Sequence, residues 1–576
     1  MPLVVWVQMP LVVDVTSRRL YGGRGDTNVQ VARGITGETT PGDHDHHIKE
    51  TTNMSDPTDD VTTVDDGAAA DGGTSATPEG GRANEREAAS FVEYGIEDKP
   101  PAGESFFLGI QHYLTMVGAN IAVPLVLINA MGPSETQAMT LIGTFFVVSG
   151  VATLLQTTIG NRYPLVQGAS FALLAPALTI VGAVGGPFDL AMRELQGAII
   201  AAAAIQVLIG YSGLMGRLKR YLSPVVVAPV IALIGLSLFS TPQIVMPQQN
   251  WWLLGLTLVC IVGFSQYLDA YSRYARLFPV LLGIVTAYLV AVGLSVAGIY
   301  APGQVGYVAP SAALDAPIVL SITPLQWGVP AFTPAYIVGM FAGVVASMIE
   351  SYGDYFAVAR LAGVGAPSRK RIDHGIGMEG IGNVFAGLMG TGNGSTSYSE
   401  NIGAIGITGV ASRQVVQVGA VVMLVVGFFG PFSQLIVTIP DPIIGGLFIA
   451  MFGQIAAVGL SNLKYVDLDA QRNVFTIGLA LFAGLAIPAY FGGLEGVTAF
   501  RDGMSQVAVL GPILGTQIVA DTVFVIGQTG MAVGGIVALL LDNTIPGTRE
   551  ERGLDQWEAI SEEEHEFQTV LERYTE

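Results

Sequence analysis

Charged side chains are scarce in this chain, and so are cysteine and histidine. Only 12% of the 576 residues are charged, whereas an ordinary soluble protein carries about a quarter. The single cysteine, Cys260, lies in an apolar run, which excludes a disulfide within the chain and a thiolate metal site. The apolar part of the chain holds only His112 and His374. A membrane-embedded enzyme would need a ligand cluster such as HExxH or a nucleophile–base pair, and neither is found.

Long apolar runs dominate what remains. Hydrophobic residues make up 51% of the chain, and runs of roughly 20 of them recur from Phe106 to Leu541, each long enough to cross about 30 Å of hydrocarbon. We therefore predict an all-α polytopic membrane protein. The predicted transmembrane segments are fourteen, at residues 106–130, 138–160, 164–185, 194–213, 223–240, 251–268, 278–299, 334–361, 376–392, 398–411, 414–436, 443–460, 472–492 and 527–543. A weaker stretch at 505–525 is interpreted as re-entrant or interfacial.

Acidic residues gather at the two ends of the chain. Residues 38–98 hold 16 Asp and Glu and residues 550–576 hold ten, so 26 of the 46 acidic residues lie there. We predict an acidic, disordered N-terminal tail at 1–100, a membrane domain at 101–548, and an acidic cytoplasmic tail at 549–576. Acidic tails give no reason to expect nucleic acid as a partner.

The N-terminal tail carries two further features. Met54 begins a more natural protein start than Met1, so residues 1–53 are interpreted as an over-extension. His44, His46 and His47 could suggest metal binding, but in a flexible acidic tail a solvated stretch is the better reading, and no metal site is predicted.

Basic residues in the loops test the segment count. With the N-terminus inside, the loops on the opposite side receive only Arg193 and Arg501, in agreement with the positive-inside rule. Both termini are therefore expected in the cytoplasm, and the protein in the plasma membrane. The cytoplasmic loops receive Arg162, Arg217, Lys219, Arg220, Arg273, Arg276, Arg369, Lys370, Arg371, Arg413, Lys464, Arg472, Arg549 and Arg552.

A loop without Lys or Arg, residues 300–334, divides the segments into seven and seven, which forces the halves into opposite orientations. Segments five and twelve share the spacing of a proline and a glycine. Pro224 lies 11 positions before Gly235, and Pro442 lies 11 positions before Gly453. Segments three and ten are both short and broken. If the Gly and Pro residues served only to pack membrane helices together, they would explain either break alone. Paired breaks in two inverted halves instead indicate the midplane site of a transporter.

The tenth segment lies in the polar stretch GTGNGSTSYSENIGAIGITGVASR, from Gly390 to Arg413. An ionisable residue inside a membrane, here Glu400, is a functional-site hypothesis by default. This stretch resembles the signature of the nucleobase–ascorbate transporter family, or nucleobase:cation symporter family 2. Three further motifs agree: Gln111-His112 in the first segment, ESYGD from Glu350 in the eighth, and LDNTIPG from Leu541.

The resemblance, which covers roughly residues 106–547, implies an architecture and a mechanism. Segments 1–4 and 8–11 would form a core, and segments 5–7 and 12–14 a gate that usually forms a homodimer. Short strands in segments three and ten would meet at the substrate, and the core would move past the gate in an elevator-like step.

The same resemblance and the chemistry of a flat base, whose edge carries N–H donors and carbonyl acceptors, select the substrate site. Carboxylates can accept from ring N–H groups, backbone N–H groups at half-helix N-termini can meet carbonyl oxygens, and aromatic rings can flank the base. The predicted substrate-binding residues are Glu350, Glu400, Tyr398, Ser399, Asn401, Phe171, Ala169 and Ser170.

Coupling to a cation is expected to use Glu350, Asp354 and Glu379, because a carboxylate in a low-dielectric site can bind a proton near neutral pH. A purely structural hydrogen bond is an equally good reading of Asp354 and Glu379. A second group of residues, expected to shape the helices, comprises Gln111, His112, Gly403 and Thr408. Asp521 and Asp542 are expected to face an interface or water.

These features predict a secondary active transporter that takes up a nucleobase such as uracil, xanthine or urate with protons, and that needs no cofactor besides the coupling ion. In the family, Glu400 corresponds to Gln or Glu in nucleobase carriers and to Pro in animal ascorbate carriers. ESYGDY and IGITGVASR also resemble the sodium-coupled ascorbate branch, so a sodium-coupled nucleobase or ascorbate symporter is the alternative. An anion transporter of the same seven-plus-seven architecture is a rival class that would lack these carboxylates.

Overall fold

The computed structural model describes residues 92–218, 221–309, 311–494, 496–555, 567–569 and 572–573. The chain separates into two units, Met1–Ala76 and Thr77–Glu576, and all of the described residues belong to the second. The predictions for the N-terminal tail up to residue 91, including the start at Met54 and the three histidines at 44–47, lie outside the described residues. So does most of the predicted C-terminal tail.

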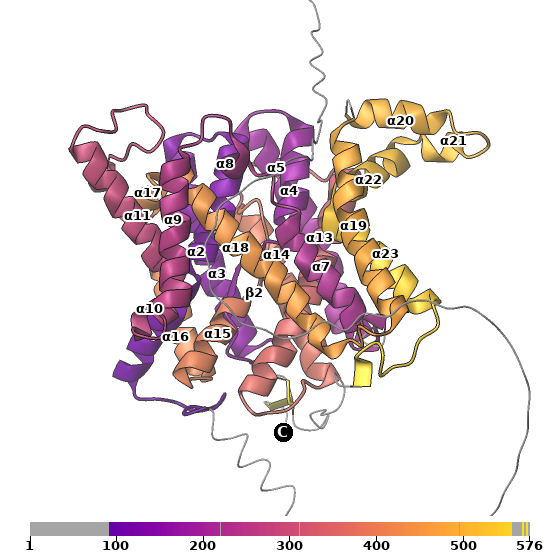
Figure 1. Ribbon diagram of the computed structural model, residues 1–576, viewed down its shortest axis with the longest axis horizontal. Helices are drawn as coiled ribbons and strands as arrows, with labels where there is room; N and C mark the ends of the chain where they lie inside the picture. Colours follow the sequence, from indigo (N-terminus) through magenta and orange to yellow (C-terminus); the bar gives the residue numbers. More distant parts are fainter. Residues whose placement is uncertain are drawn as a thin grey trace, which may run out of the picture. The chain divides into compact units, whose positions relative to one another are not determined.

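The described residues are almost entirely helical (Figure 1). The helices of the first half are α2 (Ala102–Met131), α3 (Glu135–Thr158), α4 (Leu174–Val184), α5 (Phe188–Tyr211), α6 (Leu214–Leu218), α7 (Pro224–Leu236), α8 (Pro242–Val245), α9 (Trp251–Val262), the π-helical turn η2 (Gly263–Tyr267), α10 (Arg273–Leu277), α11 (Pro279–Val296) and α12 (Ala312–Asp315). Those of the second half are α13 (Pro334–Leu361), α14 (Arg369–Met389), α15 (Ser399–Thr408), α16 (Arg413–Gly427), α17 (Gly430–Val437), α18 (Asp441–Ser461), the 3₁₀ turn η3 (Asn462–Tyr465), α19 (Gln471–Gly492), α20 (Val497–Ser505), α21 (Gly511–Leu514), α22 (Gln517–Gly527) and α23 (Gly530–Thr544).

Seven described helices are long and apolar enough to cross a membrane, namely α2, α3, α5, α11, α13, α18 with η3, and α19. The pair α22 and α23, bent by 93°, would make an eighth. Shorter apolar helices α4, α7, α9 and α16 lie within four more of the predicted segments. The chain is therefore a helical protein with many apolar spans, while the count of fourteen stays a prediction. The stretch predicted as interfacial contains α21 and most of α22, which follow α20.

Two three-residue strands interrupt the helices. β1 (Gln167–Ala169) pairs antiparallel with β2 (Ser395–Ser397), with Gly168 opposite Thr396. They lie in predicted segments three and ten, and each precedes a short helix, α4 or α15. Hydrogen bonding between the strands satisfies backbone groups that a broken helix would otherwise leave unpaired in hydrocarbon.

Glycines let several helices approach each other closely. A Cβ on Gly109 of α2 would lie 2.8 Å from the backbone nitrogen of Gly419 on α16. A Cβ on Gly235 of α7 would lie 2.3 Å from the carbonyl oxygen of Phe452 on α18. Packing through small residues is typical of membrane helices, because lipid supplies no hydrophobic force between them.

The most extensive helix contacts fall within two sets. In the first, α14 packs against α5 and α3, α13 against α5, and α16 against α2 and α3. In the second, α7 packs against α18, α19 and α23, and α9 against α11 and α18. We call these the first and the second helix set. Their members correspond to the predicted core and gate, and the assignment of those two roles remains a prediction.

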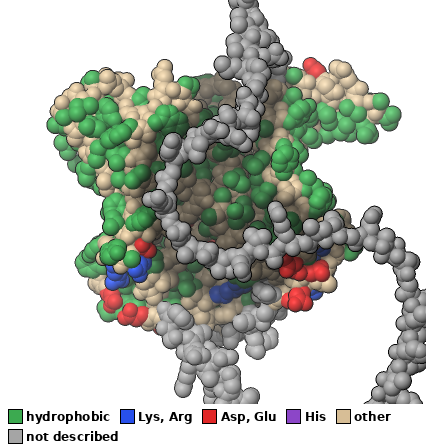
Figure 2. Space-filling model, viewed as in Figure 1, with side chains coloured by type: hydrophobic (Ala, Val, Ile, Leu, Met, Phe, Trp, Pro, Cys, Tyr) green, Lys and Arg blue, Asp and Glu red, His purple; other side chains and the backbone are tan. Residues whose placement is uncertain are grey.

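Charged side chains are unevenly placed on the visible face of the molecule. Figure 2 shows Lys, Arg, Asp and Glu gathered in the lower part of that face, while nearly all of the area above is hydrophobic or uncharged. The large exposed side chains include Leu208, Val259, Leu289 and Phe482, each with at least 62% of its surface exposed. Such exposure is expected where lipid rather than water surrounds a helix.

Candidate substrate site

A cavity of about 490 Å³ lies between the two helix sets. One wall comes from α13 and from the start of α15, and the other from α7, α18 and η3. Six of the lining residues belong to the predicted site or its coupling groups, namely Phe171, Glu350, Asp354, Tyr398, Ser399 and Glu400. The predicted binding residues Ala169, Ser170 and Asn401 and the predicted coupling residue Glu379 do not line this cavity.

Three asparagine side chains position the strands and the chain that leads into them. Asn120 Oδ1 accepts from the Ala169 N–H at 3.0 Å, and Asn393 Oδ1 accepts from the Ser170 N–H at 2.8 Å. Asn401 Oδ1 accepts from the Val166 N–H at 2.9 Å. All three asparagines are buried, so each replaces the water that irregular backbone would otherwise need.

These bonds correct one expectation. Ala169 and Ser170 were predicted to offer free backbone N–H groups to a substrate carbonyl. Both N–H groups already donate to the asparagine oxygens, and Ser170 N–H lies 3.3 Å from the Gly394 carbonyl oxygen as well. The sequence analysis did not single out Asn120. A lone Asn within the apolar run of the first segment was the signal that could have found it, but only the fold places it against β1.

Three carboxylates surround one end of the cavity. Asp354 Oδ1 accepts from Ser399 Oγ at 2.8 Å, which joins α13 to the start of α15. Asp354 Oδ2 and Glu350 Oε2 are buried and have no hydrogen-bond partner within the part of the chain that the structure describes. Glu400 lies in the first turn of α15, where the positive end of the helix dipole favours a negative side chain. The site can therefore accept several N–H groups or a cation.

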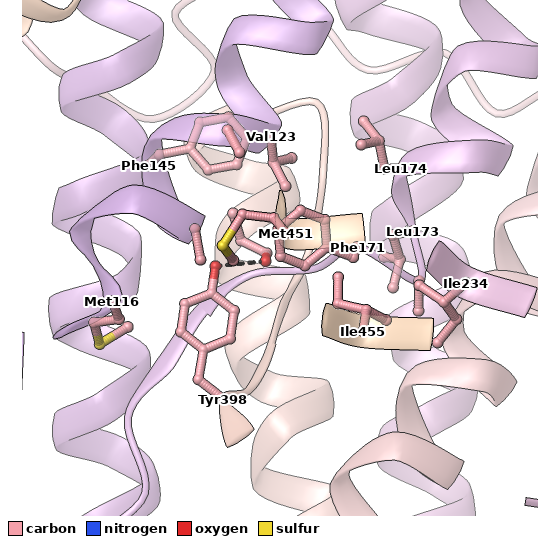
Figure 3. Close-up of a cluster of buried hydrophobic side chains, with 14 of the residues drawn as sticks. Met116, Val123, Phe145, Phe171, Leu173, Leu174, Ile234, Tyr398, Met451 and Ile455 are labelled. Atoms are coloured by element: carbon pink, nitrogen blue, oxygen red, sulfur yellow. Dashed lines mark hydrogen bonds between the residues drawn. The ribbon is translucent and has the colours of Figure 1, made fainter. Parts of the chain in front are cut away.

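Aromatic and apolar side chains line the cavity beside the carboxylates. Tyr398 is buried, and its hydroxyl donates to the Ala169 carbonyl oxygen at 2.8 Å, which is drawn as the dashed line in Figure 3. The Phe171 ring contacts Phe452 of α18 edge to face, with ring centroids 6.0 Å apart. Figure 3 shows Met451 and Ile455 of α18 beside Phe171. The two predicted aromatic residues are thus held by contacts on both sides of the cavity.

Glu379 lies away from the cavity in a saturated hydrogen-bond network. Its Oε1 accepts from Gln206 Nε2 at 3.1 Å and from Ser347 Oγ at 3.0 Å, and its Oε2 accepts from Ser351 Oγ. Ser351 Oγ in turn lies 3.1 Å from Thr396 Oγ1 of β2. This arrangement suits a group that positions β2, and the part of Glu379 in coupling stays a prediction.

The four residues expected to shape the helices lie outside the cavity. His112 is buried, and its Nδ1 lies 3.1 Å from Asn401 Nδ2, so it supports the asparagine that holds Val166. Thr408 Oγ1 donates to the Ala404 carbonyl oxygen at 2.8 Å near the end of α15. Gly403 is exposed on α15, and Gln111 is half-buried on α2.

Several cavity residues were not predicted from the sequence. Gln454 is an exposed amide on α18, and a lone Gln within an apolar run was the signal that could have found it. Arg360 and Lys464 line the other end of the cavity beside Tyr465, with the Arg360 Cζ 5.0 Å and the Lys464 Nζ 4.9 Å from its ring centroid. Cation–π contacts of this kind are electrostatic attractions to the ring face.

Asp542 corrects a further expectation. Its side chain is fully buried rather than facing an interface or water, and it is paired with Arg472 at 3.0 Å and Arg552 at 2.7 Å. Ser223 Oγ donates to it at 2.7 Å. No group of three or more His, Cys, Asp or Glu side chains that could hold a metal ion occurs among the described residues.

Apolar spans, paired broken segments and an acidic cavity between two helix sets define a multi-pass membrane protein of the transporter class. A family model described as the permease family matches residues 103–493. Together with the relatives below, it shows that the chain belongs to the nucleobase–ascorbate transporter family, a family of transporters and not of enzymes.

Similar proteins come from animals and plants. The chain is 40% identical over 515 residues to solute carrier family 23 member 2 of Homo sapiens, covering 81% of this chain and 77% of that one. It is 35% identical over 518 residues to nucleobase-ascorbate transporter 12 of Arabidopsis thaliana, covering 81% and 72%. Among solved structures, the transmembrane domain of a cyanobacterium bicarbonate transporter, BicA, is similar with a TM-score of 0.46 and 14% identity, covering 68% of this chain and 100% of that one.

Proposed function

We propose that this protein takes up a nucleobase, such as uracil, xanthine or urate, together with a cation, by an elevator-like movement of the first helix set past the second. The coupling ion in this proposal is a proton. The proposal includes fourteen spans in two inverted halves, both termini in the cytoplasm, location in the plasma membrane and a homodimer formed through the second set.

One observation carries the proposal. Glu350 Oε2 and Asp354 Oδ2 are buried beside one cavity, and neither has a hydrogen-bond partner among the described residues. Leaving a buried carboxylate oxygen without a donor is costly. A ligand that brings N–H groups, or a proton, would satisfy these oxygens, and a nucleobase edge provides such donors.

The remaining cavity chemistry fits the same ligand. Phe171 supplies an apolar face, and Gln454 an amide that can both donate and accept. A volume of about 490 Å³ falls within the usual range for a small-molecule site. The carboxylates lie on the first set and Gln454 on the second, so both walls would contact one bound molecule.

The alternatives differ in their ion and substrate. A sodium-coupled nucleobase or ascorbate symporter is the closer alternative, favoured by the name of the plant relative, which covers both substrates. Three carboxylates facing the cavity disfavour the rival reading as an anion transporter, because an anion would meet like charge there.

Uptake into proteoliposomes would test the proposal. We expect radiolabelled uracil or xanthine to accumulate when an inward proton gradient is imposed, to stop when a protonophore collapses it, and to be insensitive to sodium. Accumulation driven by a sodium gradient alone would show that the coupling ion is sodium and not a proton. Tight ascorbate uptake without competition by nucleobases would overturn the substrate assignment.

A further inference from the structure

The C-terminal end of the chain contacts the first helix set. Phe567 is 1% exposed, its ring centroid lies 4.8 Å from the Arg371 Cζ, and it lies 5.9 Å from the centroid of the His374 ring. Five residues further on, the Glu572 carboxylate accepts from Lys370 Nζ at 2.6 Å. Lys370, Arg371 and His374 all belong to the first two turns of α14.

The same C-terminal region is also anchored to the second helix set, through residues 549–555. Arg552 Nη2 pairs with Asp542 of α23 at 2.7 Å. The Glu551 carbonyl oxygen accepts from Asn473 Nδ2 of α19 at 2.8 Å and from the Asp467 N–H at 3.1 Å. Leu554 is 2% exposed. This anchor is buried and has several hydrogen bonds, so it should persist whatever happens downstream.

The two anchors lie on helices that pack in different sets. α14 packs against α5 and α3, while α19 and α23 pack against each other and against α7. In Figure 1 the yellow chain after α23 reaches the level of the lower ends of the helices. Described residues of the C-terminal region, 549–555 on one side and 567–569 with 572–573 on the other, therefore contact a helix of each set.

The two contacts on α14 differ in kind. Lys370 and Glu572 are 34% and 45% exposed, so their ion pair contributes little in water. The buried Phe567 ring against a guanidinium and an imidazole is the stronger contact, because it removes apolar surface from water and adds a cation–π attraction. A contact of this composition can form and release as the sets move.

The side of the membrane to which the cavity opens indicates the conformation in which Phe567 contacts α14. The cavity extends from the carboxylates to Arg360, Asn462 and Lys464, at the ends of α13 and α18. Lys464 is one of the basic loop residues that the positive-inside rule assigns to the cytoplasm. The α14 end that binds Phe567 starts with Arg369, Lys370 and Arg371, and the same rule places it on that side.

We propose that the C-terminal segment is an internal brake, which docks through Phe567 and Glu572 on the first two turns of α14 and holds the cytoplasm-facing arrangement of the two helix sets. Its ligand is a segment of the same chain, and its docking surface is the one formed by Lys370, Arg371 and His374. The proposal rests on the elevator-like movement described under the proposed function. Releasing the segment would let the first set move more readily.

Thiol labelling tests the brake without any substrate. In the full-length chain with Cys260→Ser, a Gln454→Cys reporter on the cavity wall would be labelled from the cytoplasmic side by a membrane-impermeant maleimide. We expect Phe567→Ala to lower the labelling rate about 3-fold or more, because the cytoplasm-facing state becomes less populated. Asp555→Asn, in the same tail and paired with Arg549 instead of α14, is the matched control and should leave the rate unchanged.

A charge exchange keeps the test decisive if Phe567→Ala folds poorly. The native ion pair contributes little, but each single reversal places two like charges at the docking site, so Lys370→Glu and Glu572→Lys should each lower labelling, by less than Phe567→Ala does. The double variant removes the repulsion and should restore labelling towards the parent value. Unchanged labelling in Phe567→Ala and in both single variants would overturn the brake. A labelling change in a protein that transports no nucleobase would leave the brake standing and overturn only the proposed substrate.

Discussion

At the residue scale, the cavity is distinguished by carboxylates that the protein itself leaves partly unsatisfied. Ser399 satisfies one oxygen of Asp354, while the other and Glu350 Oε2 have no partner among the described residues. Glu379, by contrast, accepts from three side chains. A carboxylate that binds a ligand is expected to keep an oxygen without a partner in the protein, whereas a carboxylate that holds the fold together is expected to have all its partners there.

Replacing Glu350 or Glu400 by Gln should weaken substrate binding while leaving the fold intact. Gln keeps the shape but removes the charge, and a hydrogen bond to a charged group contributes about 1.5–3 kcal/mol, so KM should rise about 10- to 100-fold. Initial uptake rates over a substrate series in proteoliposomes would measure this. The control is Asp502→Asn, which changes an exposed carboxylate of α20. A normal KM in both cavity variants would show that Glu350 and Glu400 do not bind the substrate.

Glu97, which precedes α2, should make stability depend on acidic pH. Burial raises the pKa of Glu97, but the hydrogen bond from Arg413 and the charge of Arg162 outweigh it and hold this pKa below its ordinary value of 4.5. Because the folded pKa is lowered, the contribution to stability is complete above pH 4.5 and is lost as pH falls further, through the lowered pKa.

Thermal unfolding midpoints of the detergent-solubilised protein would check this dependence. In Glu97→Gln, we expect a lower midpoint at pH 7 and a smaller drop between pH 5 and pH 3 than in the parent protein. An equal drop in both proteins would show that Glu97 is not responsible.

At the element scale, the short strands are held by contacts that leave no room for larger side chains. Gly168 of β1 faces the Tyr398 ring, and an added Cβ would lie 2.5 Å from a ring carbon. The pairing with Thr396 of β2 and the Tyr398 hydroxyl bond to Ala169 depend on that approach. The strand pair is thus a rigid unit whose position sets the aromatic wall of the cavity.

Gly168→Ala should therefore reduce transport strongly. The overpacking costs about 1–3 kcal/mol, and it displaces Tyr398 rather than a remote side chain, so uptake should fall about 10-fold or more. Gly182→Ala in α4 is the matched control, because nothing lies within 4 Å of its added Cβ, and its uptake should be normal. Equal uptake in the two variants would contradict a rigid strand pair.

At the scale of the whole molecule, buried charges hold the end of the second helix set together. Asp542 of α23 is 0% exposed and lies between Arg472 of α19, 9% exposed, and Arg552, 15% exposed. Ser223 at the start of α7 adds a hydrogen bond. Elements separated by more than 300 residues in the chain meet at this carboxylate.

Asp542→Ala should be strongly destabilising, since it leaves two guanidinium groups that are only 9% and 15% exposed without their counter-charge. Breaking a buried ion pair costs about 3–5 kcal/mol, whereas an exposed pair contributes about 0–1 kcal/mol. Asp555→Ala removes the exposed partner of Arg549 and is the control. Denaturant unfolding in detergent would compare the two, and similar losses would show that the Asp542 cluster is not buried as described.

The sequence by itself determined the class of protein and the position of most elements. Hydropathy is a sum over neighbouring residues, so the segment predicted at 334–361 coincides with α13, Pro334–Leu361. The breaks in segments three and ten were equally visible, because Gly, Pro and polar side chains are local features. Family motifs then pointed to Glu350 and Glu400, which do lie on one cavity.

Only the tertiary structure decided which polar groups meet. Asn120 occupies the Ala169 N–H that was expected to be free, and Gln206 reaches Glu379. Gln454 lines the same cavity as the carboxylates, from the opposite helix set. It also buried Asp542 between two arginines. Hydropathy depends on neighbours along the chain, whereas a hydrogen bond depends on contacts between residues far apart in it, and those contacts exist only once the helices have packed.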